Sequence, residues 1–265
     1  MITDINLSLG RWPFQRFDIE TPRQMAAHLR KHGIGEGWVC AADSVLYPDP
    51  DVYDERLFRS LSGTRNLHLV KTVNPTLANW RKSLRAWAGD RGVRAVKVYP
   101  NYHQYSLKDS CAGELAAELR RLRLPLMVAM RIEDERSHYP LMKVPGVPCK
   151  DVVALARAFP RVPVVALCSY LHEARALTAG SANIHVDTSF IEAMDTLKAA
   201  AGAMPARRIL FGSHTPFFYT RAETMKLGLA NISRRAWSLI ARDNAQRIFK
   251  ASVTGSRRRP TRDRT

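Results

Sequence analysis

The sequence predicts an α/β protein folded as a single-domain (β/α)8 barrel, and three observations carry this prediction. Short runs rich in β-branched residues alternate with helical patterns along almost the whole chain of 265 residues. Eight such runs can be counted, and each is followed by a helical pattern. Together the eight pairs occupy about 250 residues, which is the usual size of this barrel.

The expected strands and helices follow one another in strict order. The strands cover residues 2–9, 37–42, 66–74, 93–99, 124–132, 162–168, 183–188 and 208–212. Between them, apolar residues recur three or four positions apart, which is the spacing of an amphipathic helix. The helices cover 22–32, 54–61, 77–88, 113–123, 150–159, 171–179 and 193–202, and a C-terminal pair ends near Phe249.

Several helix ends carry recognisable signals. Thr21 stands before Pro22, which gives an N-cap residue followed by proline at the first helical position. Gly33, Gly92 and Gly180 fall where helices are expected to stop, because glycine readily adopts the left-handed conformation of a helix end.

A doubly wound open sheet is the competing architecture. It would typically place a glycine-rich phosphate loop after the first strand, and residues 9–13 (Leu-Gly-Arg-Trp-Pro) do not form one. The barrel is therefore favoured and is assigned to residues 1–251. Residues 252–265 are rich in Arg, Ser and Thr without apolar periodicity, and they are expected to form a basic, disordered tail.

Composition places the chain among ordinary globular proteins. It is 46% hydrophobic and 25% charged, with a mean hydropathy of −0.25, which excludes collagenous and membrane-spanning classes. The N-terminus lacks the basic and apolar regions of a signal peptide. Four scattered cysteines show no framework spacing, so reduced thiols and a cytoplasmic location are expected.

The chain is strongly basic. Lys and Arg number 41 against 24 for Asp and Glu, a formal net charge of +17. Because most of the excess is spread over predicted helices, we expect solvated helix faces and only non-specific attraction of nucleic acid through the basic tail. No membrane partner is expected, and the oligomeric state is left open.

Polar residues gather where the predicted strands end. In a barrel of this class the active site is built at the C-terminal ends of the strands. The candidate substrate-binding residues there are Asn6, Ser8, Arg11, Lys97, Arg131 and Glu133. The candidate catalytic residues are Tyr99, His103, Asp187 and His214.

Two of these groups leave alternatives open. Lys97 and Arg131 lie within apolar runs. They either face the pocket or form structural ion pairs with Asp187 or Glu133. We expect them to face the pocket, because a buried cation needs a partner or a ligand. His103 lies in a loop, where a packed role and a catalytic role are equally compatible with the sequence.

Six segments in this order resemble the amidohydrolase-related family, which comprises metal-dependent (β/α)8 hydrolases and decarboxylases. The resemblance covers residues 1 to about 250. It rests on residues 4–10, 96–102, 124–128, 185–189, 211–216 and 243–249. Its most specific parts are Phe-Gly-Ser-His-Thr-Pro at 211–216 and Asp-Asn-Ala-Gln-Arg-Ile-Phe at 243–249.

The departures from this family concern the metal ligands. The family's first strand usually ends in His-x-His, where this chain has Asn6 and Ser8. Histidines usual on the fifth and sixth strands are replaced by residues 129–131 (Ala-Met-Arg) and 168–169 (Cys-Ser), and the usual aspartate of the last strand is His214. The resemblance therefore implies that the metal centre is lost and that no cofactor is bound. A residual mononuclear site of His214, Asp187 and His103 is left open.

The resemblance and the residues together predict a hydrolase acting on a small anionic substrate. Lys97, Arg131 and Arg11 would form an anion clamp. His214, oriented by Asp187 or Ser213, would be the general acid or base, while Tyr99 and Asn6 orient the substrate. Two alternatives remain: a decarboxylase or other lyase of the same family, and a catalytically degenerate barrel that only binds a ligand.

Overall fold

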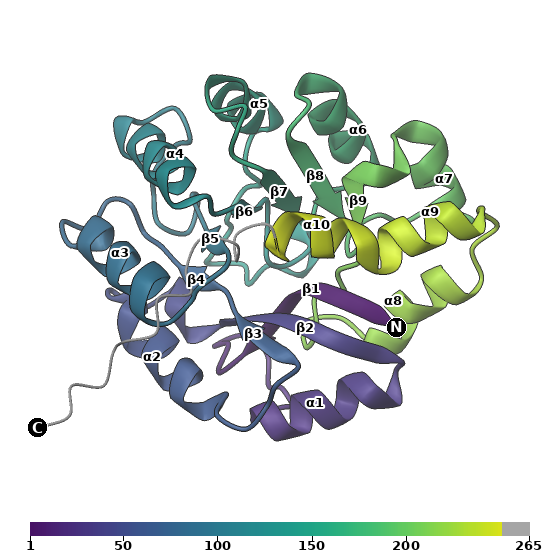
Figure 1. The fold of residues 1–265 in the computed structure, drawn as a ribbon, viewed down its shortest axis with the longest axis horizontal. Helices are drawn as coiled ribbons and strands as arrows, with labels where there is room; N and C mark the ends of the chain where they lie inside the picture. Colours follow the sequence, from purple (N-terminus) through teal and green to yellow (C-terminus); the bar gives the residue numbers. More distant parts are fainter. Residues whose placement is uncertain (251–265) are drawn as a thin grey trace, which may run out of the picture.

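A ring of parallel strands surrounded by helices makes up the described part of the protein, residues 1–250 of a computed structural model (Figure 1). The strands are β1 Ile2–Leu9, β2 Ile34–Ala41, β3 Leu67–Leu69, β4 Lys71–Thr72, β5 Val96–Val98, β6 Leu126–Ala129, β7 Val164–Leu167, β8 Ile184–Asp187 and β9 Ile209–Leu210. All neighbouring pairs are parallel. The predicted barrel is confirmed.

β3 and β4 together occupy one of the eight barrel positions. Between them, the Val70 backbone N–H donates to the Val39 carbonyl (2.8 Å), whereas that of Lys71 donates to Ala95 (3.1 Å). Within one barrel position, the chain therefore passes from hydrogen bonding with β2 to hydrogen bonding with the segment that leads into β5. The ring closes where the Ile5 N–H donates to the Phe211 carbonyl at 3.1 Å.

Helices follow the strands and cover the outside of the ring. They are α1 Pro22–Lys31, α2 Pro50–Ser60, α3 Trp80–Asp90, α4 Ser110–Leu122, α5 Cys149–Ala158, α6 Leu171–Gly180, α7 Thr196–Ala203, α8 Thr220–Gly228, α9 Arg234–Ser238 and α10 Asn244–Lys250. A π-helical segment, Leu239–Asp243, joins α9 to α10. The predicted start of α1 is confirmed, because Thr21 and Gln24 form a reciprocal capping box.

The alternation of side chains along each strand divides the core in two. Outward residues such as Leu7, Val39 and Val96 pack against the helices. Inward residues such as Ile5 and Met127 fill the barrel interior together with side chains of α10. This helix lies across one end of the barrel (Figure 1), where Phe249 stacks on Trp38 with ring centroids 4.6 Å apart. That end is the one at which the strands begin.

No helix among residues 1–250 is long and apolar enough to cross a membrane. The predicted basic tail, 252–265, lies outside the described residues.

Candidate functional site

A polar network fills the barrel interior at the end where the strands finish. It is built from inward-facing side chains of β1, β2, β5, β7, β8 and β9 or of residues that closely follow these strands. Its members, all less than 5% exposed, are Asn6, Ser8, Cys40, Lys97, Cys168, Asp187, Ser189 and His214. Parallel strands aligned in register deliver these side chains to one level, as the pairing of Ser8 with Cys40 illustrates.

Asn6 is the hub of this network. Its Nδ2 donates to Asp187 Oδ2 at 2.9 Å and to Cys168 Sγ at 3.3 Å. Its Oδ1 accepts from Lys97 Nζ at 3.0 Å. The amide thus uses both its donor and its acceptor, and this fixes the orientation of the side chain.

Lys97 places an ammonium group inside the barrel. Besides Asn6, its Nζ contacts Cys40 Sγ at 3.6 Å and lies 5.3 Å from the centroid of the Tyr99 ring. Within residues 1–250, it forms no ion pair with a carboxylate. A buried cation whose close partners are all neutral favours the binding of an anion.

Asp187 is held by three donors. Its Oδ1 accepts from the Cys168 backbone N–H at 2.8 Å, and its Oδ2 accepts from Ser189 Oγ at 2.8 Å as well as from Asn6. Burial raises the pKa of Asp187, while these hydrogen bonds and the charge of Lys97 oppose the rise. Asp187 acts here as a fixed acceptor that orients Asn6.

His214 is neutral in this setting. Burial, and then the charge of Lys97, lower its pKa to about 3. Its Nε2 lies 2.6 Å from the Ile132 carbonyl, which can only accept, so the Nε2–H form is assigned and Nδ1 is left as an acceptor. The predicted orientation by Asp187 or Ser213 is not what the structure has, since the Ile132 carbonyl does this.

Cys168 faces the free lone pair of His214. Its Sγ lies 3.6 Å from His214 Nδ1, and burial together with the nearby Asp187 raises the pKa of the thiol to about 12. The pair is therefore a thiol and a neutral imidazole. Both residues have left-handed backbones, with φ of 59° and 54°, a conformation that stores strain and is often found at functional sites.

Aromatic rings cover the network at the mouth of the barrel. Trp12 contacts the ring of Phe217 (centroids 5.5 Å apart) and that of Tyr102 (6.0 Å). Phe217 also stacks on the His214 ring at 4.7 Å. Trp12 and Phe217 stand on the loops that follow β1 and β9, so they separate the buried polar groups from solvent.

The predicted anion clamp of Lys97, Arg131 and Arg11 is not assembled. Arg131 makes a bidentate ion pair with Glu173 on α6, with N–O distances of 2.6 and 2.7 Å, and stacks over Tyr170. It is a structural ion pair, but with neither of the two acids expected. Arg11 is exposed and lines a separate cavity of about 960 Å³ beside the mouth.

Three other predicted residues lie around the network. The Tyr99 hydroxyl contacts Cys40 Sγ at 3.3 Å, so Tyr99 borders the network. His103 donates from Nε2 to the Val45 carbonyl at 3.1 Å, and burial lowers its pKa to about 4, which describes a packed loop histidine. Glu133 is half-buried; burial raises the pKa of Tyr102, and the charge of Glu133 raises it further.

Sequence reasoning omitted Cys40, Cys168 and Ser189 from the site. Their positions carried a usable signal, because Cys40 and Ser8 are both inward positions near the ends of adjacent strands, and Cys168 and Ser189 closely follow two others. Scattered cysteines were interpreted only as reduced thiols. In the structure they supply weak acceptors to Asn6 and Lys97.

Comparison with solved structures identifies the fold. A 2,6-dihydroxybenzoate decarboxylase from Rhizobium is 14% identical, with 94% of this chain and 98% of that chain covered and a TM-score of 0.73. A dihydroxybenzoic acid decarboxylase from Polaromonas sp. JS666, with bound manganese and the inhibitor 2-nitroresorcinol, is 13% identical (96% and 99% covered, TM-score 0.76).

A 5-carboxyvanillate decarboxylase from Novosphingobium aromaticivorans, complexed with manganese and a nitrobenzoic acid, is 11% identical (94% and 96% covered, TM-score 0.76). No protein-family model and no curated protein matches this sequence. All three are decarboxylases by name, and the likeness to them confirms the barrel fold that the sequence resemblance implied.

The residues of this chain do not fit the manganese of those structures. Within residues 1–250, no three side chains of His, Cys, Asp or Glu come together as a set of metal ligands, so the residual site of His214, Asp187 and His103 is not assembled. Besides an amide, hydroxyls, thiols and an ammonium, the centre offers one carboxylate, Asp187, and one imidazole, His214, which are bound to other groups of the protein. The ammonium of Lys97 would repel a dication.

Proposed function

We propose that this protein is a metal-independent lyase that removes carbon dioxide from a small aromatic carboxylate bound beside Lys97. The observation that carries the proposal is the buried ammonium of Lys97, 3% exposed and held by neutral partners only. The fold shared with decarboxylases of hydroxylated benzoates supports this substrate class. Hydrolysis, the main expectation from the sequence, has less support, because nothing in the centre would activate water as a bound metal does.

The chain's own groups have definable roles in this reaction. The substrate carboxylate lies against the apolar cover of Trp12 and Phe217, where its charge is poorly solvated. The bond between the ring carbon and the carboxylate breaks, the electron pair stays on the ring carbon, and that carbon takes a proton from Lys97 Nζ. Carbon dioxide leaves, and water reprotonates the amine.

The positive charge of Lys97 acts most strongly as negative charge develops on the ring carbon. Asn6 and Cys40 hold Nζ in place, and Asp187 in turn holds Asn6. The neutral Nδ1 of His214, which faces the Cys168 thiol at 3.6 Å, would accept a hydrogen bond from a ring hydroxyl in place of the thiol. Substrate reaches this position when the contact between Trp12 and Phe217 opens.

A ligand-binding barrel without turnover is the second candidate, and one observation favours it. The polar groups of the centre already satisfy one another, and three cavities of about 1080, 960 and 460 Å³ in the described part of the chain are lined by other residues. Such packing is typical of a centre whose role has become structural.

The test measures carbon dioxide released from a panel of hydroxybenzoates by the full chain treated with a chelator. Lys97→Met should lower the rate by about 10²–10⁴-fold, the usual effect of removing a general acid. Methionine is apolar and of similar length, so the variant should fold, which its melting curve checks. Lys198→Met, on an exposed position of α7, is the matched control and should leave the rate unchanged.

Three results bear on the alternatives. Ligand binding without carbon dioxide release would favour the second candidate. A rate that depends on added manganese would contradict the metal-independent reaction. Equal rates in the wild type and Lys97→Met would remove Lys97 from the chemistry.

A further inference from the structure

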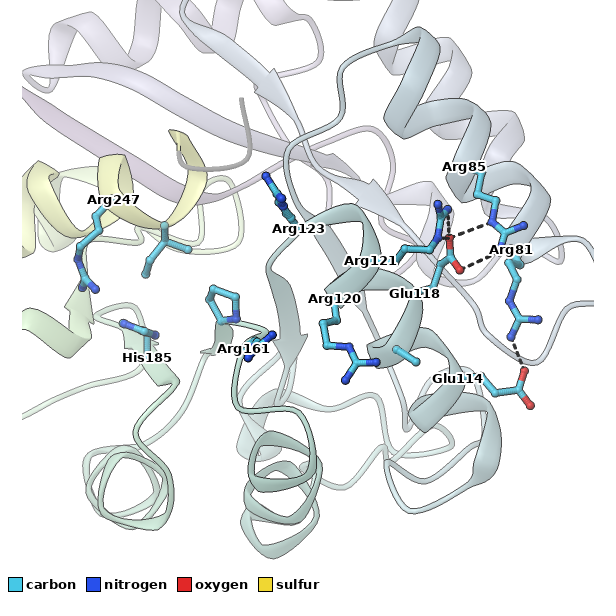
Figure 2. Close-up of a pocket in the computed structure, with 13 residues that line it drawn as sticks. Arg81, Arg85, Glu114, Glu118, Arg120, Arg121, Arg123, Arg161, His185 and Arg247 are labelled. Carbon is cyan, nitrogen blue, oxygen red and sulfur yellow. Dashed lines mark hydrogen bonds and ion pairs between the residues drawn. The ribbon is translucent and has the colours of Figure 1, made fainter. Parts of the chain in front are cut away.

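An arginine-rich cavity lies at the opposite end of the barrel, where the strands begin (Figure 2). Its volume is about 1080 Å³. Seven arginines line it against two glutamates: Arg81, Arg85, Arg120, Arg121, Arg123, Arg161 and Arg247, with Glu114 and Glu118. Because the catalytic ends of the strands lie at the other end, this cavity is independent of the proposed reaction.

One half of the cavity is neutralised by its own acids. Arg81 pairs with Glu114 at 2.7 Å, and Arg85 and Arg121 both pair with Glu118 (Figure 2). The two arginines around Glu118 lower its pKa to about 2, although burial opposes this. These contacts join α3 to α4 and hold that wall of the cavity.

The other half carries charge without acids. Arg120, Arg123 and Arg161 are exposed, and within residues 1–250 none of them pairs with a carboxylate. Arg247, on α10, donates to the Arg207 carbonyl at 2.8 Å rather than to an acid. In Figure 2 the labelled side chains of Arg120, Arg123, Arg161 and Arg247 surround the open part of the cavity.

The positive charge of this half of the cavity contributes to lowering the pKa values of two nearby groups. Burial is the main cause that lowers the pKa of Arg208, and the charges of Arg207 and Arg247 lower it further. His185, at the cavity wall, has its pKa lowered to about 4 by burial and then by Arg247. Like charges therefore accumulate here without relief, and an anion would be stabilised.

The lining indicates the kind of anion. Guanidinium groups match phosphate through paired hydrogen bonds. Among the described residues, the lining contains no Phe, Tyr or Trp on which an unpaired base could stack, and its apolar members are Ala117, Pro163 and Ile248. Stacking is the usual means of holding single strands, and a protein partner would need an apolar centre. A duplex, whose bases are already stacked, fits this surface.

The sequence beyond α10 adds to the same charge. The chain leaves the described part at Lys250, directly after the cavity residues Arg247 and Ile248. Residues 251–265 contain five arginines and one aspartate. The third variant described below tests this part of the sequence separately.

We propose that this face binds the phosphate backbone of a nucleic-acid duplex without reading its bases. DNA and RNA share the phosphodiester chemistry, so both belong to the test. The probes are a DNA duplex, an RNA duplex and the corresponding single strands, each of about 20 nucleotides with a fluorescent label, titrated with the full chain over a series of salt concentrations.

Three full-length variants locate the site. The first carries Arg120→Gln, Arg123→Gln and Arg161→Gln. The matched control carries Arg23→Gln, Arg30→Gln and Arg221→Gln, which removes the same charge from exposed positions of α1 and α8. The third replaces the five arginines of residues 257–264 with glutamine.

The first variant should bind duplex about tenfold or more weakly at low salt, and the slope of log affinity against log salt should fall by about 3. The control should stay near the wild type, and single strands should bind more weakly than duplexes. Loss of binding only in the third variant, equal loss in the first variant and the control, or a preference for single strands would overturn the proposal. Melting curves confirm that all variants are folded.

Discussion

The proposed function assigns the positive charge of the site to a single residue, Lys97. Three decarboxylases have a similar barrel fold, and two of them contain manganese. Here Asn6 binds an ammonium group at 3.0 Å, and the remaining polar atoms bind one another. A fixed positive charge on the chain can stabilise developing negative charge, but it cannot lower the pKa of a water as a metal does.

The ion-pair partner of Arg131 could not be predicted from the sequence of its own strand. Its place in an apolar run correctly indicated burial, and its side chain is 2% exposed. Its partner Glu173 lies 42 residues later, on a helix that only the barrel topology brings near. The sequence offered Asp187 and Glu133 as partners because both were already assigned to strand ends.

The ion pair between Arg131 and Glu173 gives a testable prediction about stability. Glu173→Gln keeps the shape of the side chain but leaves Arg131 buried without a counter-charge, so the free energy of unfolding should fall by about 3 kcal/mol. Urea unfolding at neutral pH measures this. Glu114→Gln, which breaks the exposed pair with Arg81, is the control and should change stability by less than about 1 kcal/mol. Similar small effects in both variants would show that the buried pair is not needed.

Most elements could be predicted because each carries a local signal. The bounds of β1 agree with the prediction, and every expected helix is present. β2 begins three residues earlier than expected, at Ile34. The strands after it are shorter than expected, although their hydrogen bonding continues: the Val73 N–H donates to the Lys97 carbonyl and the Met130 N–H to Leu167, both at 3.0 Å. An apolar composition shows how far along the chain a segment stays buried. The regular hydrogen bonding that defines a strand ends before that point.

The seam between β1, the loop after β9 and α8 contains two buried acids. Asp4 accepts from the Asn6 and Ser213 backbone N–H groups at 3.0 and 3.1 Å, and Glu223 on α8 pairs with Lys226 at 2.8 Å. Burial is the main cause that raises the pKa of Asp4 to about 7 and that of Glu223 to about 8.

These shifts predict that stability falls as pH rises. Both acids lose their protons more readily in the unfolded chain, where their pKa values are near 3.8 and 4.5, so ionisation favours unfolding. Between pH 6.5 and 8 the free energy of unfolding should fall by roughly 2 kcal/mol, and Glu223→Gln should remove more than half of this fall. Urea unfolding at both pH values tests it, with the exposed Glu192→Gln as control. A variant whose stability falls as steeply as the wild type would exclude Glu223.

The barrel as a whole has two distinct polar regions, one at each end. The end where the strands finish holds a closed polar network under aromatic rings. The end where they begin is plugged by α10 and carries the arginine-rich cavity. The sequence predicted the first end from polar residues at strand ends. It did not predict the second, because Arg81, Arg120, Arg161 and Arg247 lie far apart in the chain and meet only through the closed ring.

The proposed reaction rests on the ammonium group of Lys97 and on no bound divalent metal. Its most direct test is to strip the full chain with a chelator, dialyse it against manganese and measure bound metal by elemental analysis. We expect no stoichiometric manganese, in the wild type and in Asp187→Asn alike. One manganese ion per chain, lost in Asp187→Asn, would contradict it.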